Sequence, residues 1–156
     1  QRILKVMMIN GKSIVVFLAT ITLSQCIFKI KDLQRMVSSA DDRLELKLLN
    51  KQDNIPRNEI KKKVDAIVQK QPSDVQDTYN ALLQAKEAKD EAEYNVDVID
   101  LKQQGASNEV LMALEKIHNI TLDMSLSRSE EEKQIKAVKN SLKKKDRKIL
   151  DKLEQN

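Results

Sequence analysis

Few side chains in this 156-residue sequence have the chemistry of a catalyst. It holds one histidine, His118, one cysteine, Cys26, and only two glycines. A nucleophilic triad needs a base beside Ser or Cys, and a phosphate-binding loop needs closely spaced glycines. The Asp and Glu residues are spread over what we expect to be solvated helix faces, where carboxyl groups keep their ordinary pKa values. We therefore expect a protein that is not an enzyme and uses no cofactor.

Glu115 and His118 form the one pattern with metal-binding spacing. In Glu-x-x-His both side chains lie on one face of a helix, and di-iron bundles use this spacing on two helices, with further Glu residues from two more. The sequence offers half of that set because it has no second histidine. We therefore expect no metal site, and interpret His118 as a solvated residue or one that compensates a helix dipole.

The segment Asn119-Ile-Thr121 matches the acceptor pattern for N-glycosylation. Such a short pattern is often fortuitous, and it has meaning only if the chain passes through a eukaryotic secretory pathway. Asn119 is therefore a conditional modification site.

Lysine-rich sequence between residues 133 and 152 is the most conspicuous surface feature. An anionic membrane, a sulfated polysaccharide or nucleic acid would suit it. Nucleic acid is the least favoured partner, since no aromatic residue is interleaved for base stacking. The competing interpretation is a solvated helix whose charges complement an acidic remainder, within one chain or across a homodimer. The candidate basic surface comprises Lys139, Lys143, Lys144, Lys145, Arg147 and Lys148.

Residues 1–26 have the layout of a secretory signal peptide: a charged start, a short apolar stretch and small residues at its end. The apolar stretch is 13–24, and Met7 is the first methionine, so the residues before it are interpreted as upstream read-through. Ser24 and Cys26 are the small residues three and one places before the expected cut. We therefore expect cleavage after Cys26.

Two alternatives tether the chain to a membrane. Leu23–Cys26 resembles a bacterial lipobox, which would place a lipid on Cys26, although Gln25 fits that motif poorly. Residues 13–28 are the other alternative, a signal anchor, but a membrane-spanning helix needs about 20 apolar residues. Simple secretion is favoured over both.

Composition predicts a helical protein. Aromatic residues make up 3% of the chain, there is no Trp, and charged residues make up 33%. The net charge of +4 overstates the basic character, because residues 27–156 hold 25 basic and 24 acidic residues. Within them, residues 133–156 hold nine basic and three acidic residues, so the remainder is acidic. A single cysteine supports no disulfide scaffold.

Apolar spacing of three and four residues predicts the helices that must position these features. We expect an all-α fold, with residues 27–156 as a single domain: an antiparallel bundle of four to five helices, coiled-coil-like in one arrangement. Gly105 is expected to stop a helix, and alternation over residues 120–126 indicates a frayed helix end or an ordered loop. The expected helices are 28–50, 56–70, 73–103, one that begins after Ser107, and 129–154, with capping boxes at Ser73–Gln76 and Ser129–Glu132.

These observations together predict a small secreted, non-enzymatic helical protein. It would act by binding an unidentified protein partner or an anionic surface, with the basic C-terminal helix as the contact. The alternative is a membrane-tethered surface protein.

Overall fold

The computed structural model describes residues 28–153. The expected signal peptide, its read-through residues and the processing of Cys26 lie outside this range. Within it the fold is all-α, as predicted, and one isolated bridge pairs Pro56 with Ser127. The described helices are α1 (Ile30–Met36), α2 (Ala40–Leu49), α3 (Arg57–Val68), α4 (Ser73–Gln103), α5 (Asn108–Leu122), α6 (Arg128–Ser141) and α7 (Lys144–Leu153).

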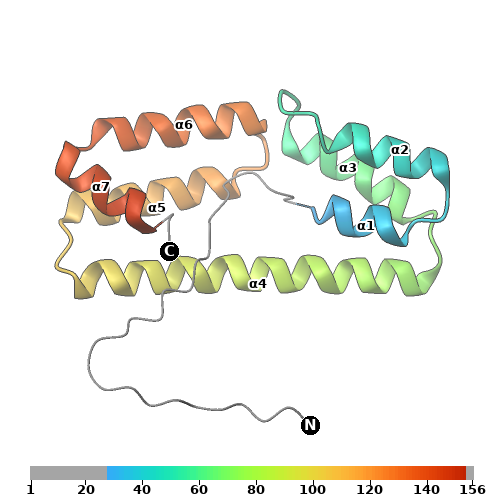
Figure 1. Ribbon diagram of the computed structural model, residues 1–156, viewed down its shortest axis with the longest axis horizontal. Coiled ribbons are helices and arrows are strands. Elements are labelled where there is room, and N and C mark those ends of the chain that lie inside the picture. Colours follow the sequence, from blue (N-terminus) through green and yellow to red (C-terminus); the bar gives the residue numbers. More distant parts are fainter. Residues whose placement is uncertain (1–27, 154–156) are drawn as a thin grey trace, which may run out of the picture.

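Helix α4 connects two groups of helices. It has 31 residues, which corresponds to about 46 Å. Figure 1 shows α1–α3 against its first half and α5–α7 against its second half. We call these the N-terminal lobe (residues 28–84) and the C-terminal lobe (residues 85–153).

Each lobe has its own apolar core. In the N-terminal lobe, Tyr79 of α4 is buried with α1–α3, and its hydroxyl donates a 2.8 Å hydrogen bond to the carbonyl oxygen of Phe28. In the C-terminal lobe, Leu101 of α4 is buried with α5–α7. The fully or nearly buried apolar residues are Phe28, Ile30, Leu33, Val37, Leu46, Leu49, Ile60, Val64, Ile67, Val68 and Tyr79 in the first core, and Leu101, Val110, Ala113, Ile120, Ile135, Val138 and Leu150 in the second.

Gly105 ends α4 as predicted. Its φ of +69° is in the left-handed region that glycine adopts without strain. The Gly105 N–H donates to the Lys102 carbonyl, and the Ala106 N–H donates to the Leu101 carbonyl. This pair of bonds is a Schellman motif, which satisfies carbonyls left free at a helix end.

The single helix predicted for 28–50 is wrong. The helix breaks after Met36, where Val37 is extended, and α2 begins beyond Ser39, whose side chain accepts a hydrogen bond from the Asp42 N–H. Serine favours such caps because its hydroxyl replaces a backbone acceptor. The break changes the buried face of α2, so that Leu44 and Leu48 are 56% and 54% exposed.

The single helix predicted for 129–154 is also wrong. Helix α6 ends at Ser141, Leu142 is extended, and α7 starts at Lys144. The capping box lies two residues before the predicted one, at Ser127 and Glu130. The predicted cap, Ser129, instead donates its hydroxyl to the Asn54 side chain.

Two further boundaries differ from expectation. Ser73 is the first residue of α4 and Pro72 is its N-cap, so the capping box predicted at Ser73–Gln76 is wrong; the Gln76 side chain donates to the Gln71 carbonyl instead. Helix α5 continues to Leu122, so only the second half of residues 120–126 forms the ordered loop that leads to α6.

Candidate basic contact surface

The turn between α6 and α7 divides the candidate basic residues into two groups. Arg147 points back to the end of α6. There its Nε donates a 3.0 Å hydrogen bond to the Lys139 carbonyl, and an Nη donates one of 3.3 Å to the Asn140 carbonyl. Lys139 is mostly covered, and its Nζ lies 3.9 Å from the Asp151 carboxylate. These two cations therefore hold the helix turn together.

The other four candidates are exposed. Lys143 lies in the turn, and Lys144, Lys145 and Lys148 follow in α7. No salt bridge joins any of the four to a carboxylate between residues 28 and 153. Leu150 is buried in the C-terminal core on the other side of α7, so the helix turns its apolar side inward and these lysines outward. We call this set the α7 lysine surface.

The structure separates positive from negative charge. Helix α4 holds eight acidic and three basic residues, whereas residues 128–153 hold ten basic and five acidic residues. In Figure 1, α4 runs along the lower edge and α6 along the upper edge of the C-terminal lobe. In the described part of the chain no salt bridge joins α4 to α7. The α7 lysines are therefore not neutralised by the acidic helix within the chain.

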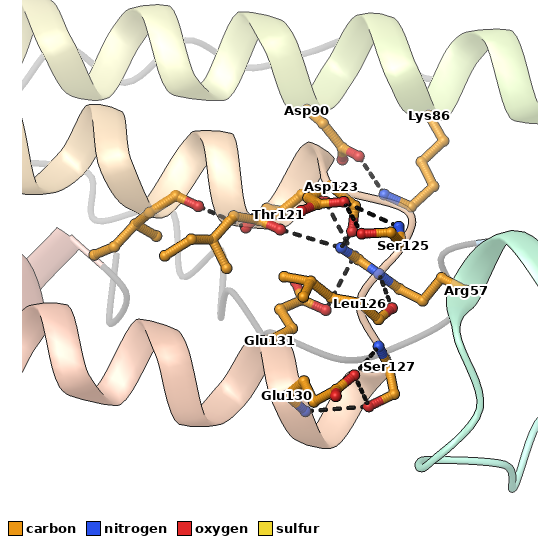
Figure 2. A network of polar contacts seen from close by, with 12 residues as sticks. Arg57, Lys86, Asp90, Thr121, Asp123, Ser125, Leu126, Ser127, Glu130 and Glu131 are labelled. Atoms are coloured by element: carbon orange, nitrogen blue, oxygen red, sulfur yellow. Dashed lines mark hydrogen bonds and ion pairs between the residues drawn. The ribbon is translucent and has the colours of Figure 1, made fainter.

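Buried Arg57 fixes the C-terminal lobe against the N-terminal lobe. It begins α3, is 1% exposed, and points into the loop after α5 (Figure 2). Its guanidinium donates to four carbonyls, and its Nη1 lies 3.0 Å from a Glu131 carboxylate oxygen. The acceptors, with distances, are Ile120 (3.1 Å), Thr121 (3.0 Å), Asp123 (2.6 Å) and Leu126 (3.2 Å).

Two of those carbonyls, from Ile120 and Thr121, belong to the last turn of α5, where intrahelical donors run out. The Ile120 carbonyl also accepts the Asp123 N–H, at 3.3 Å. Arg57 therefore caps α5 from a different lobe. Burial raises the pKa of Glu131, and the nearby Arg57 charge opposes that rise. A five-donor planar group suits this site because it can serve several acceptors at once.

Arg128 makes a second connection between the lobes. Its Nη1 donates 2.7 Å to the Asn50 carbonyl and lies 3.3 Å from the Asp53 carboxylate. The next residue, Ser129, donates its backbone N–H to the Asp53 carbonyl at 2.9 Å. The start of α6 is thus fixed on the loop between α2 and α3.

His118 and Glu115 are not arranged as a metal site. The His118 ring stacks on Tyr94 of α4, with ring centroids 3.8 Å apart, and its Nε2 lies 3.6 Å from a Glu91 carboxylate oxygen. Glu115 is exposed. Among residues 28–153, no group of three His, Cys, Asp or Glu side chains could hold a metal ion.

Asn119 is exposed in the last turn of α5. Its carbonyl accepts the Asp123 N–H at 3.1 Å, so the acceptor pattern is part of a folded helix end.

Asp97 is a site that the sequence reasoning missed. Asp97 lies on α4, and its partial burial raises its pKa to about 6. The neighbouring Asp100 and Glu93 carboxylates add to the rise. The sequence carried a signal, because acids three and four residues apart share one helix face. The expectation of unshifted carboxyl groups is wrong here.

No family model, curated protein or solved structure matches the chain. Helices that are both long and apolar enough to cross a bilayer are absent from residues 28–153. Fold and side-chain geometry therefore carry the functional argument.

Proposed function

We propose that this is a small, secreted, non-enzymatic helical protein that binds an extended anionic surface through the α7 lysine surface. The observation that supports the proposal is the group of four exposed lysines, none of which forms a salt bridge within residues 28–153. Lys143 lies close enough to Glu109 for its charge to help lower the pKa of that carboxyl group. Because no salt bridge holds these ammonium groups within residues 28–153, none has to be broken before an outside partner binds. The acidic α4, which forms no salt bridge with α7 in the described chain, adds a charge asymmetry that would favour approach of a negative surface from the α7 side.

Binding of heparin and of phosphatidylserine vesicles tests the proposal. Lys143, Lys144, Lys145 and Lys148 are replaced by Glu, while Arg147 is kept because it caps α6. The matched control reverses the same number of exposed lysines elsewhere, at Lys62, Lys63, Lys70 and Lys116.

We expect the α7 variant to lose binding to at least one of the two probes and the control variant to retain most of it. Binding should also weaken with salt, since the Debye length falls from about 30 Å at 10 mM to about 10 Å at 0.1 M. Equal loss in both variants, or no binding by the unaltered protein, would refute the proposal.

Secretion is the second part of the proposal, with cleavage after Cys26 and the membrane-tethered form as its alternative. Expression of the full chain, followed by fractionation and intact mass measurement, separates them. A soluble product that begins at Ile27 supports secretion. A lipid increment on Cys26, or an uncut chain in the membrane fraction, supports the tethered form instead.

A further inference from the structure

A basic hollow lies between α1 and α2, far in sequence from the α7 lysine surface. It has a volume of about 430 Å³ and opens to solvent. Four cationic side chains and two amides line it, and no carboxylate does. The lining residues are Lys31, Gln34 and Arg35 from α1, and Lys47, Asn50 and Lys51 from the end of α2 and the turn that follows.

The two helices contribute the same pattern of residue types. Residues 31–35 read Lys-x-x-Gln-Arg and residues 47–51 read Lys-x-x-Asn-Lys. Positions separated by three and four residues share a helix face. Helix α1, and α2 together with the turn that follows it, each present a cation, an amide and a second cation. The hollow is where the two sets of side chains face one another.

The walls of the hollow are held in place by polar contacts. Gln34 Nε2 donates 3.0 Å to the Arg43 carbonyl, which joins α1 to α2. The Asn50 carbonyl accepts from Arg128 at 2.7 Å, which joins this site to α6. Leu33 of α1 and Leu49 of α2 are buried in the N-terminal core, which fixes both helices. The cations are therefore gathered by folded elements rather than by a flexible tail.

Little negative charge balances these cations. Arg35 meets Asp32 at 3.4 Å, but its side chain is 79% exposed, and such a pair is weak. Lys31, Lys47 and Lys51 have no salt bridge within residues 28–153.

Compensation of helix dipoles does not explain this arrangement. It accounts for Arg35 and Lys47, which lie in the last turns of α1 and α2. Lys31 lies in the first turn of α1, where a positive charge is unfavourable.

We propose that this hollow binds a compact ligand with two or more tetrahedral oxyanion groups, such as phosphate esters. Ammonium and guanidinium groups supply charge-assisted hydrogen bonds to such oxygens, and side-chain amides add neutral donors. The volume is in the range of small-molecule sites. The ligand is either a free polyphosphate or a phosphorylated headgroup on a membrane.

Inorganic pyrophosphate and vesicles with phosphatidylinositol bisphosphate are the two probes. Backbone amide NMR of the protein, in about 10 mM salt where charge screening is weak, follows each titration. We expect saturable shifts in α1 and α2 with pyrophosphate, or vesicle binding if the headgroup is the source.

The double variant Lys31→Gln with Lys47→Gln should lower the affinity for whichever probe binds the unaltered protein by at least about tenfold. The control, Lys62→Gln with Lys63→Gln on α3, should not. The α7 lysines stay in place in both variants, so failure here is distinct from failure of the proposed function. Non-saturable shifts with pyrophosphate and no vesicle binding, or equal weakening in the control, would overturn the proposal.

Discussion

Replacement of Arg57 by Met tests whether the buried guanidinium holds the two lobes together. The change removes four hydrogen bonds to carbonyls and leaves the Glu131 carboxylate, whose side chain is 10% exposed, without its cation at 3.0 Å. Met retains much of the apolar stem, so the measured effect isolates the loss of the charged, hydrogen-bonding head.

The expected cost is about 4 kcal/mol of the free energy of unfolding. Removal of one partner from a buried ion pair costs about 3–5 kcal/mol. Each hydrogen bond to a charged group contributes about 1.5–3 kcal/mol, but four bonds on one side chain are not additive. A domain of ordinary stability, about 5–15 kcal/mol, would be severely weakened.

Urea unfolding followed by circular dichroism measures this cost. The double variant Arg57→Met with Glu131→Met should be about 1–3 kcal/mol more stable than the sum of the single effects, because it leaves no unpaired carboxylate. Arg35→Met, which removes an exposed pair, serves as the control and should cost less than about 1 kcal/mol.

The pH dependence of stability gives a second test of the Arg57→Met variant. The Glu131 pKa, already raised by burial, should rise further without Arg57. A neutral Glu131 costs less to bury, so the stability difference between unaltered protein and variant should shrink as pH falls. A cost below about 1 kcal/mol at neutral pH, equal to that of the control, would refute the role assigned to Arg57.

Other substitutions test separate parts of the structure. Asp97→Asn should stabilise the protein above about pH 6 and have no effect below its ordinary pKa of 3.8. The folded chain binds more protons than the unfolded chain between these values, so the stability contributed by Asp97 falls as pH rises through this window. The full pKa shift corresponds to about 3 kcal/mol, and we expect a gain of about 1 kcal/mol in the free energy of unfolding because the carboxyl group is partly exposed to solvent. Urea unfolding at one pH above 6 and one below 3.8 measures this gain. An equal gain at both pH values would contradict the prediction. Gly105→Ala should lower the free energy of unfolding by about 1 kcal/mol. Backbone strain alone would cause this loss, because a Cβ at this position meets no atom within 4 Å. Thermal unfolding measures it, and an unchanged melting temperature would contradict the left-handed conformation. Arg147→Ala should destabilise α6 and α7, seen as faster amide hydrogen exchange there, whereas Lys148→Ala should not; similar exchange in both would remove the distinction between cap and contact surface.

Local rules predicted the helical content because they depend on composition and nearby residues. The end of α4 at Gly105 and its start near Pro72 followed from the conformations that these two residue types favour. The exposed lysines of α7 followed from their density in the sequence. These features need no knowledge of what packs against them.

Features that depend on tertiary packing were missed. The breaks at Val37–Ser39 and at Leu142 interrupt patterns that read as continuous helices, because periodicity is nearly preserved across them. Periodicity gives the apolar face of a helix but not its partner, so it did not reveal that the core is in two parts. Arg57 carried no signal, since a charged residue in a first turn ordinarily faces solvent.

The hydrogen bond from Tyr79 to the Phe28 carbonyl bears on how the chain could be processed. Phe28 is 4% exposed, so it is fixed in the N-terminal core two residues after Cys26. Two residues span at most about 7 Å. A lipid on Cys26 would therefore hold the N-terminal lobe directly against the bilayer, with no spacer between them. An enzyme that acts at Cys26 would also need extended chain on both sides of the bond, so export and processing would have to come before this corner of the protein folds.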